Sequence, residues 1–153
     1  MPSMKLIAAA LWVGLSAAMP ACMPIPERAV PEIEGRLMAA NGDPMVARTV
    51  KRIVEFSEED VRQGRACERA GDIARTDSDG NFHFDGSWRF PTPLYGDPNW
   101  RVLLCVQDNK DTIPSWRAGH IGRTPALITL SCRTESRPGS PEVKCWTEPT
   151  SQR

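Results

Sequence analysis

The sequence has no excess of charge of either sign, because its 153 residues include 19 Lys and Arg and 19 Asp and Glu. The basic residues are spread along the chain, so the sequence lacks the basic patch by which proteins bind nucleic-acid phosphates. Its longest apolar run, residues 6–18, is shorter than the roughly 20 residues that a transmembrane helix needs. We therefore expect a protein that neither binds nucleic acid nor crosses a membrane with this segment.

Motifs of known catalytic chemistry are also missing. The chain has no Gly-x-Ser-x-Gly, no His-Glu-x-x-His and no phosphate-binding glycine loop. Its histidines are His83 and His120, and no Cys-x-x-Cys pair accompanies them to form a zinc motif. We predict a non-catalytic protein with no cofactor and no metal site. The alternative is a periplasmic hydrolase that uses surface carboxylates such as Glu55, Asp60 and Asp85.

The N-terminal residues have the pattern of an export signal. Lys5 precedes the apolar run 6–18, and a small residue precedes Cys22. Cys22 resembles the lipid-attachment cysteine of bacterial lipoproteins. In that family an aspartate after the cysteine is the usual signal for retention in the inner membrane, and this chain has Met23 there, so the resemblance implies the outer membrane. We expect residues 1–21 to be a signal peptide and Cys22 to anchor the protein in the outer membrane, facing the periplasm. Cleavage after Ala18, which would give a soluble periplasmic or secreted protein, is the alternative.

Acylation of Cys22 would leave an even number of cysteines, namely Cys67, Cys105, Cys132 and Cys145. An even set in an oxidising compartment predicts two disulfides. Three pairings are possible. We favour Cys132–Cys145 with Cys67–Cys105, because residues 133–144 form a turn-rich segment between the last two cysteines.

The rest of the chain has the pattern of one all-β domain. Short segments of alternating polar and apolar residues are bounded by Gly, Pro, Asn and Asp, as in antiparallel strands. We expect a single antiparallel β-sandwich of about seven strands over residues 32–147, with a tether before it at 22–31 and a flexible tail at 148–153. At most one short helix is expected, near residues 57–63. The expected strands are 33–37, 46–56, 73–76, 81–85, 100–106, 126–132 and 143–146.

Two spaced motifs go beyond this general pattern. The first runs from Glu34-Gly35-Arg36-Leu37 through a turn at 41–43 to Pro44, and the second is the segment 76–84, with the sequence TDSDGNFHF. In this order they resemble the transthyretin-like, carboxypeptidase-regulatory-like β-sandwich family. The resemblance implies a non-catalytic accessory or binding module on an envelope protein. A lipoprotein subunit of an envelope secretion assembly is a sharper version of this interpretation.

Two kinds of candidate site remain. Asp77, Asp79 and Asn81 alternate around Gly80, which favours a hairpin turn over a calcium loop. The segment 88–100 concentrates aromatic residues among prolines, so it could bind an envelope protein or glycan, or could pin a long loop across the sandwich. Its possible partner-binding residues are Trp88, Phe90, Tyr95 and Trp100. A second, weaker candidate surface contains Trp116, Arg117 and His120.

Overall fold

A computed structural model describes residues 26–90, 99–108, 111–137 and 140–149. The predicted signal peptide, Cys22, Tyr95 and most of the predicted tail lie outside the described residues. Within the described part, the elements in chain order are β1 Glu27–Val30, β2 Glu32–Met38, β3 Thr49–Ile53, α2 Glu58–Arg62, the 3₁₀ turn η2 Ala66–Glu68, β4 Asp72–Arg75, β5 Asn81–Phe84, β6 Ser87–Arg89, β7 Asn99–Asp108, β8 Asp111–Ile121, β9 Leu127–Arg137 and β10 Ser140–Thr147.

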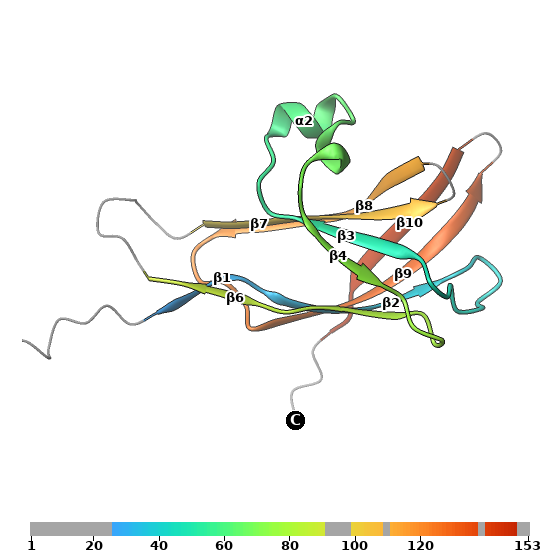
Figure 1. Cartoon of the computed structure of the whole chain (residues 1–153), viewed down its shortest axis with the longest axis horizontal. Helices are drawn as coiled ribbons and strands as arrows, with labels where there is room; N and C mark the ends of the chain where they lie inside the picture. The colour runs from blue at the N-terminus through green and yellow to red at the C-terminus, as the bar shows by residue number, and fades with distance from the viewer. Residues whose placement is uncertain (1–25, 91–98, 109–110, 138–139, 150–153) are drawn as a thin grey trace, which may run out of the picture.

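The strands form two four-stranded sheets and a separate two-stranded ribbon (Figure 1). We call the sheet of order β10-β9-β2-β5 sheet B, and the sheet of order β4-β3-β7-β8 sheet C. The expected all-β sandwich is confirmed. It has ten described strands rather than about seven, and β2 and β9 pair in parallel although the other described pairs are antiparallel.

The core lies between sheets B and C and follows from the alternation of side chains along the strands. In β2, for example, Ile33 and Leu37 point inwards and are fully buried, while Glu34 and Arg36 point outwards. The buried residues of this core are Ile33, Leu37, Val50, Phe82, Phe84, Val102, Leu104, Val106, Ile128, Leu130, Cys132 and Val143.

A second, smaller core covers the other face of sheet C. It explains why five consecutive residues of β7, 102–106, are all buried: alternate residues face the two cores. The segment 57–71 between β3 and β4, which we call the insertion, supplies most of its cover, and Figure 1 shows α2 on the side of β3 and β7 that faces away from β2. The members of this core are Ile53, Phe56, Ala66, Cys67, Leu103 and Cys105.

The expected short helix is present as α2. Ser57 caps it, because its hydroxyl accepts a hydrogen bond from the Asp60 amide at 3.0 Å while the Asp60 carboxylate accepts from the Ser57 amide at 3.0 Å. This capping box satisfies backbone donors that a helix start leaves free. The Asp60 carboxylate also pairs with Arg69, 2.8 Å away.

Several strands differ from the expectations. Residues 27–30, expected to belong to the tether, form β1 and pair with β6. The strand β8 contains Pro114 and Gly119 and shows no clear alternation, so its sequence did not predict a strand. Pro114 is tolerated because β8 lies at the edge of sheet C and the register shifts where it meets Cys105. Residues 133–144, expected to be turn-rich, mostly extend β9 and β10.

Candidate functional site

The outer face of sheet B carries a broad groove of about 1020 Å³. Its walls come from side chains that alternate outwards along four strands, and it also touches β4 through Ile73 and Arg75. We call this surface the sheet B groove. Its main outward residues are Glu34 and Arg36 of β2, Asn81 and His83 of β5, Thr129, Ser131 and Arg133 of β9, Trp146 of β10, and Glu148 after it.

The register of the strands arranges these side chains in two rows. One row is Trp146, Ser131, Arg36 and Asn81; the other contains Thr129, Glu34 and His83. Neighbouring strands are about 4.8 Å apart, so the row of four residues spans about 14 Å and the row of three about 10 Å. Trp146 is 49% exposed at one end of its row, which gives the groove one large flat apolar surface among hydrogen-bonding groups.

A histidine among carboxylates occupies the β5 edge of the groove. The Nε2 of His83 lies 3.0 Å from Asp85 Oδ1 and 4.0 Å from Glu32 Oε1, and its Nδ1 lies 3.9 Å from Glu34 Oε1. Among the described residues, Glu32, Glu34 and His83 bring donor atoms within 4.8 Å of one another, close enough to share a metal ion. All these side chains are substantially exposed.

The two sequence motifs, residues 34–44 and 76–84, are hydrogen-bonded to each other beside the groove. The Leu37 amide donates to the Gly80 carbonyl at 2.8 Å, and the Arg36 Nε donates to the Asp79 carbonyl at 2.9 Å. Gly80 has φ +80°, and a Cβ there would lie 2.5 Å from the Leu37 carbonyl oxygen. Gly35 in turn leaves space for the Phe82 ring. The motifs therefore specify the local packing of β2 against the β4–β5 turn.

The segment 77–81 is a tight turn rather than a calcium loop, as expected, but it joins β4 of sheet C to β5 of sheet B, and because these two strands do not pair it does not close a hairpin. The Asp77 carboxylate accepts hydrogen bonds from the amides of Asn81 at 2.8 Å and Asp79 at 2.9 Å. The Asn81 amide is the main reason that the pKa of Asp77 lies below its ordinary value. Because this carboxylate accepts hydrogen bonds from two backbone amides, it stabilises the turn.

The aromatic residues predicted to bind a partner do not form a single surface: Trp88 and Phe90 lie on the ribbon, apart from Trp100. Trp88 and Phe90 are 61% and 67% exposed at the end of the β1–β6 ribbon. Trp100 is half-buried on β7 and packs against the main core, and its buried Nε1 has no hydrogen-bond partner among the described residues. Tyr95 lies outside the described residues.

The weaker candidate surface is split between the core and a second groove of about 490 Å³. Trp116 packs against the main core, whereas Arg117 and His120 line this groove beside Trp100. Arg117 pairs with Glu58 at 2.7 Å, so the insertion forms one wall. The groove is smaller than the sheet B groove, and the Arg117 guanidinium in it is already paired.

The carboxylates considered for acid–base chemistry lie on different parts of the molecule. Asp60 is buried in the α2 cap, where hydrogen bonds from Ser57, and then from Arg69, hold its pKa far below the ordinary range. Asp85 contacts His83 at the edge of sheet B. Glu55 is exposed in the segment between β3 and α2.

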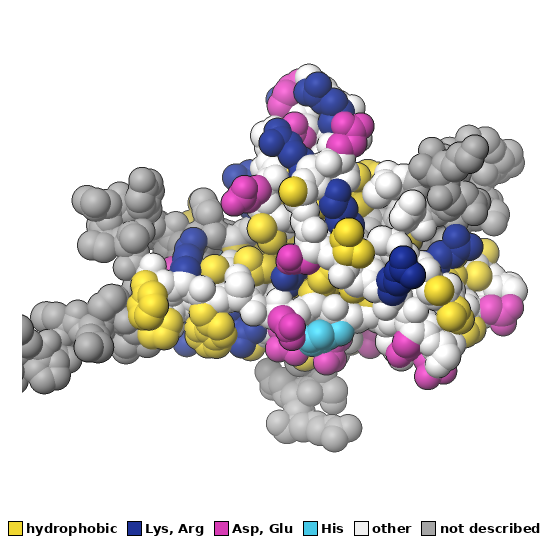
Figure 2. Space-filling model, viewed as in Figure 1, with side chains coloured by type: hydrophobic (Ala, Val, Ile, Leu, Met, Phe, Trp, Pro, Cys, Tyr) yellow, Lys and Arg dark blue, Asp and Glu magenta, His cyan; other side chains and the backbone are white. Residues whose placement is uncertain are grey.

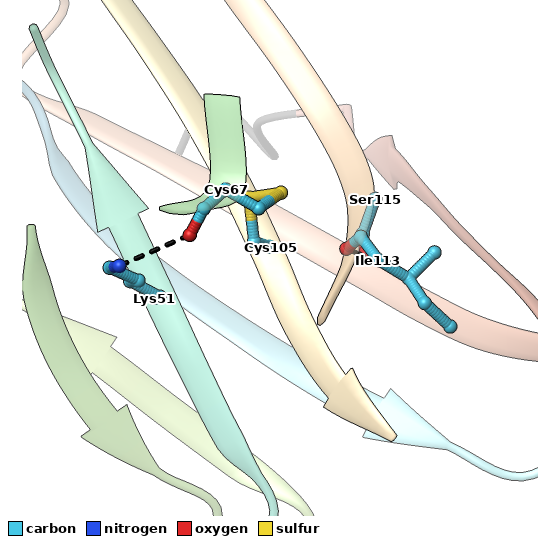
Figure 3. The surroundings of a disulfide bond; sticks show 5 residues. All are labelled: Lys51, Cys67, Cys105, Ile113 and Ser115. Atoms are coloured by element: carbon cyan, nitrogen blue, oxygen red, sulfur yellow. Dashed lines mark hydrogen bonds between the residues drawn. A yellow bond between two sulfur atoms is a disulfide. The ribbon is translucent and has the colours of Figure 1, made fainter. Parts of the chain in front are cut away.

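The four cysteines of the domain form disulfides between Cys67 and Cys105 and between Cys132 and Cys145, the pairing that the sequence favoured. The first bond ties η2 to β7, and the Lys51 Nζ donates to the Cys67 carbonyl at 3.1 Å beside it (Figure 3). The second joins directly paired residues of β9 and β10. Two disulfides indicate an oxidising, extracytoplasmic compartment. No described helix is long and apolar enough to cross a membrane.

Comparison with known proteins adds little to this geometry. No protein-family model matches the chain, and no curated protein matches it. Among solved structures, the catechol 1,2-dioxygenase from Pseudomonas arvilla C-1 is similar over 77% of this chain, with 14% sequence identity and a TM-score of 0.35. The chain spans half the length of that protein, and a likeness of this size carries no argument about activity. The class that the fold itself defines is a disulfide-bonded all-β sandwich.

Proposed function

We propose that this protein is a non-catalytic binding module of a bacterial cell envelope, held to the outer membrane by a lipid on Cys22, with its sandwich in the periplasm. The observation that carries the binding role is the sheet B groove. The insertion covers part of the outer face of sheet C, whereas the larger sheet B groove leaves polar side chains of four strands and Trp146 available to a partner.

The cysteine chemistry supports the lipid anchor. Four of the five cysteines are joined in disulfides, and Cys22 is the fifth. It follows an apolar run and a small residue, as a lipid-attachment cysteine does. A secreted chain cut after Ala18 would instead carry one cysteine without a partner in the domain.

The side chains of the groove favour a glycan as the partner. The core of a protein interface is usually built around several apolar anchors. The sheet B groove offers two exposed apolar side chains, Trp146 and Ile73, among hydroxyl, amide, guanidinium and carboxylate groups. An indole ring can cover a flat apolar surface while the polar groups around it satisfy hydroxyls, which is the combination that a saccharide chain needs.

The test is sedimentation of the detergent-solubilised mature protein with isolated peptidoglycan. We expect the wild type to sediment with the glycan and W146A to stay in solution. The matched control is W88A, which removes a tryptophan that is also exposed, 61% against 49%, but lies outside the groove, and it should sediment like the wild type. Wild type and W146A behaving alike would contradict the role of the groove.

A photo-crosslinking amino acid at Thr129, inside the groove, distinguishes the alternative partner. A crosslink in cells to one envelope protein, with no retention on glycan, would replace the glycan by a protein partner. The control position is Val46, which is 52% exposed and lies outside the groove.

A further inference from the structure

The β1–β6 ribbon carries an exposed aromatic surface that neither core uses. Trp88 and Phe90 are two positions apart and are 61% and 67% exposed. Arg28 is paired directly with Trp88, and its guanidinium lies over the indole ring at 4.8 Å. We call these three residues the ribbon patch. Figure 2 shows hydrophobic side chains gathered over the ribbon, at one end of the molecule. Two large aromatics so exposed in a small domain indicate an interaction surface.

The length of chain before β1 places this patch close to the predicted lipid. The strand β1 begins at Glu27, so four residues, 23–26, lie between it and the attachment point on Cys22. The five residue steps from Cys22 to Glu27 span at most about 18 Å even when fully extended. Trp88 pairs with the second residue of β1. An acyl chain on Cys22 would therefore hold the ribbon patch within reach of the bilayer surface.

The chemistry of the patch suits the boundary between lipid and water. Tryptophan is enriched there because its ring is apolar and its N–H can remain hydrated. The charges of the ribbon are already balanced: Arg89 pairs with Glu27 at 3.0 Å, and Arg28 lies 4.0 Å from Glu32. Binding would therefore come from the aromatic rings rather than from attraction to anionic lipids, and added salt should have little effect on it.

We propose that the ribbon patch inserts into the lipid–water interface of the membrane that carries the Cys22 lipid. This inference rests on the lipid anchor proposed above. It gives the protein two points of membrane contact, the acyl chains and the aromatic ring of Trp88 with its neighbour Phe90. Two contacts would restrict the orientation of the domain, which a single flexible anchor would not do.

The experiment uses the mature acylated protein in vesicles of phosphatidylcholine with brominated acyl chains, which quench tryptophan fluorescence on contact. The wild type, W88F and W146F are compared in brominated and in ordinary vesicles. Trp146 is the matched control, since it is 49% exposed and belongs to the sheet B groove. We expect brominated lipid to quench part of the wild-type fluorescence and to quench W146F to the same extent. W88F should lose this quenching, because Trp88 is the residue in contact with lipid, and the result should be the same at low and at high salt.

Each outcome bears on a separate statement. If the intact mass shows that the protein is acylated but the Trp88 emission is not quenched, the ribbon patch does not contact the membrane, whereas the lipid anchor stands. If Trp88 and Trp146 are quenched equally, the contact is not specific to the ribbon, and the inference is also wrong. If the protein isolated from membranes carries no lipid, both the anchor and this inference fail.

Discussion

Replacing Cys67 and Cys105 together by alanine removes the covalent link between the insertion and sheet C. The two cysteines are separated by 38 residues. On the chain-entropy account, opening a loop of this length stabilises the unfolded state by about 4 kcal/mol. A domain of this size is typically stable by only about 5–15 kcal/mol, so the loss should be large.

The bond between Cys132 and Cys145 is the internal comparison. Its separation is 13 residues, for which the same account gives about 3 kcal/mol. The strands β9 and β10 remain paired along eight residues without it. We therefore expect C67A/C105A to be the more destabilised variant, and C132A/C145A to keep its hairpin.

The assay is guanidinium chloride unfolding, with the free energy of unfolding extrapolated from the midpoint and slope. Hydrogen exchange then locates the effect: C67A/C105A should speed exchange of amides in the insertion 57–71 and leave those of the hairpin protected. A loss below about 1 kcal/mol for C67A/C105A would refute the reasoning, because the loop-entropy term would then be absent. A larger loss in the free energy of unfolding for C132A/C145A than for C67A/C105A would also refute it.

Other substitutions test single packing and charge interactions. A Cβ on Gly35 would lie 2.1 Å from the Phe82 Cζ, so G35A should cost about 1–3 kcal/mol in denaturant unfolding, and a neutral G35A would contradict the close packing. Because the pKa of Asp60 is lowered, its contribution to the free energy of unfolding is complete above about pH 5 and is lost as the pH falls towards the folded-state pKa. D60N should therefore lose less stability than the wild type between about pH 5 and acid pH, and the same dependence of stability on pH in both proteins would contradict this. Arg52 donates to the Asp72 carboxylate at 2.6 Å and the Asp85 carbonyl at 2.7 Å, so R52A should lower the thermal midpoint and cost about 2–3 kcal/mol, and an unchanged midpoint would count against it.

The elements that the sequence predicted well are those whose side chains alternate cleanly. In β5, Phe82 and Phe84 share a buried face, and the segment 81–85 was expected as a strand for that reason. The short helix followed from Ser57 and the acidic residues after it. In both cases the signal is local, because it lies within a few neighbouring residues.

The strand β8 could not be predicted in the same way. Its residues lack alternation and include Pro114, and it exists because it pairs with β7 along the sheet edge. The ribbon strands β1 and β6 are four and three residues long and stabilise each other. Such strands depend on pairing between distant segments, which a pattern along the chain does not contain.

The sheet B groove was missed for a related reason. The sequence drew attention to the aromatic segment 88–100, where the residues of interest are neighbours. Trp146, Arg36 and His83 come from three strands, and only the register of sheet B places them on the same face. The one local signal was that Trp146 has the opposite alternation to the buried Val143, so its side chain points outwards from β10.

The most direct test of the account is the intact mass of the mature protein from a membrane fraction, without reducing agent and with and without thiol alkylation. The account predicts a chain that begins at an acylated Cys22 and gains no alkyl group, because the other four cysteines are oxidised. A chain that begins at Met19, carries no lipid and gains one alkyl group would contradict the envelope anchor.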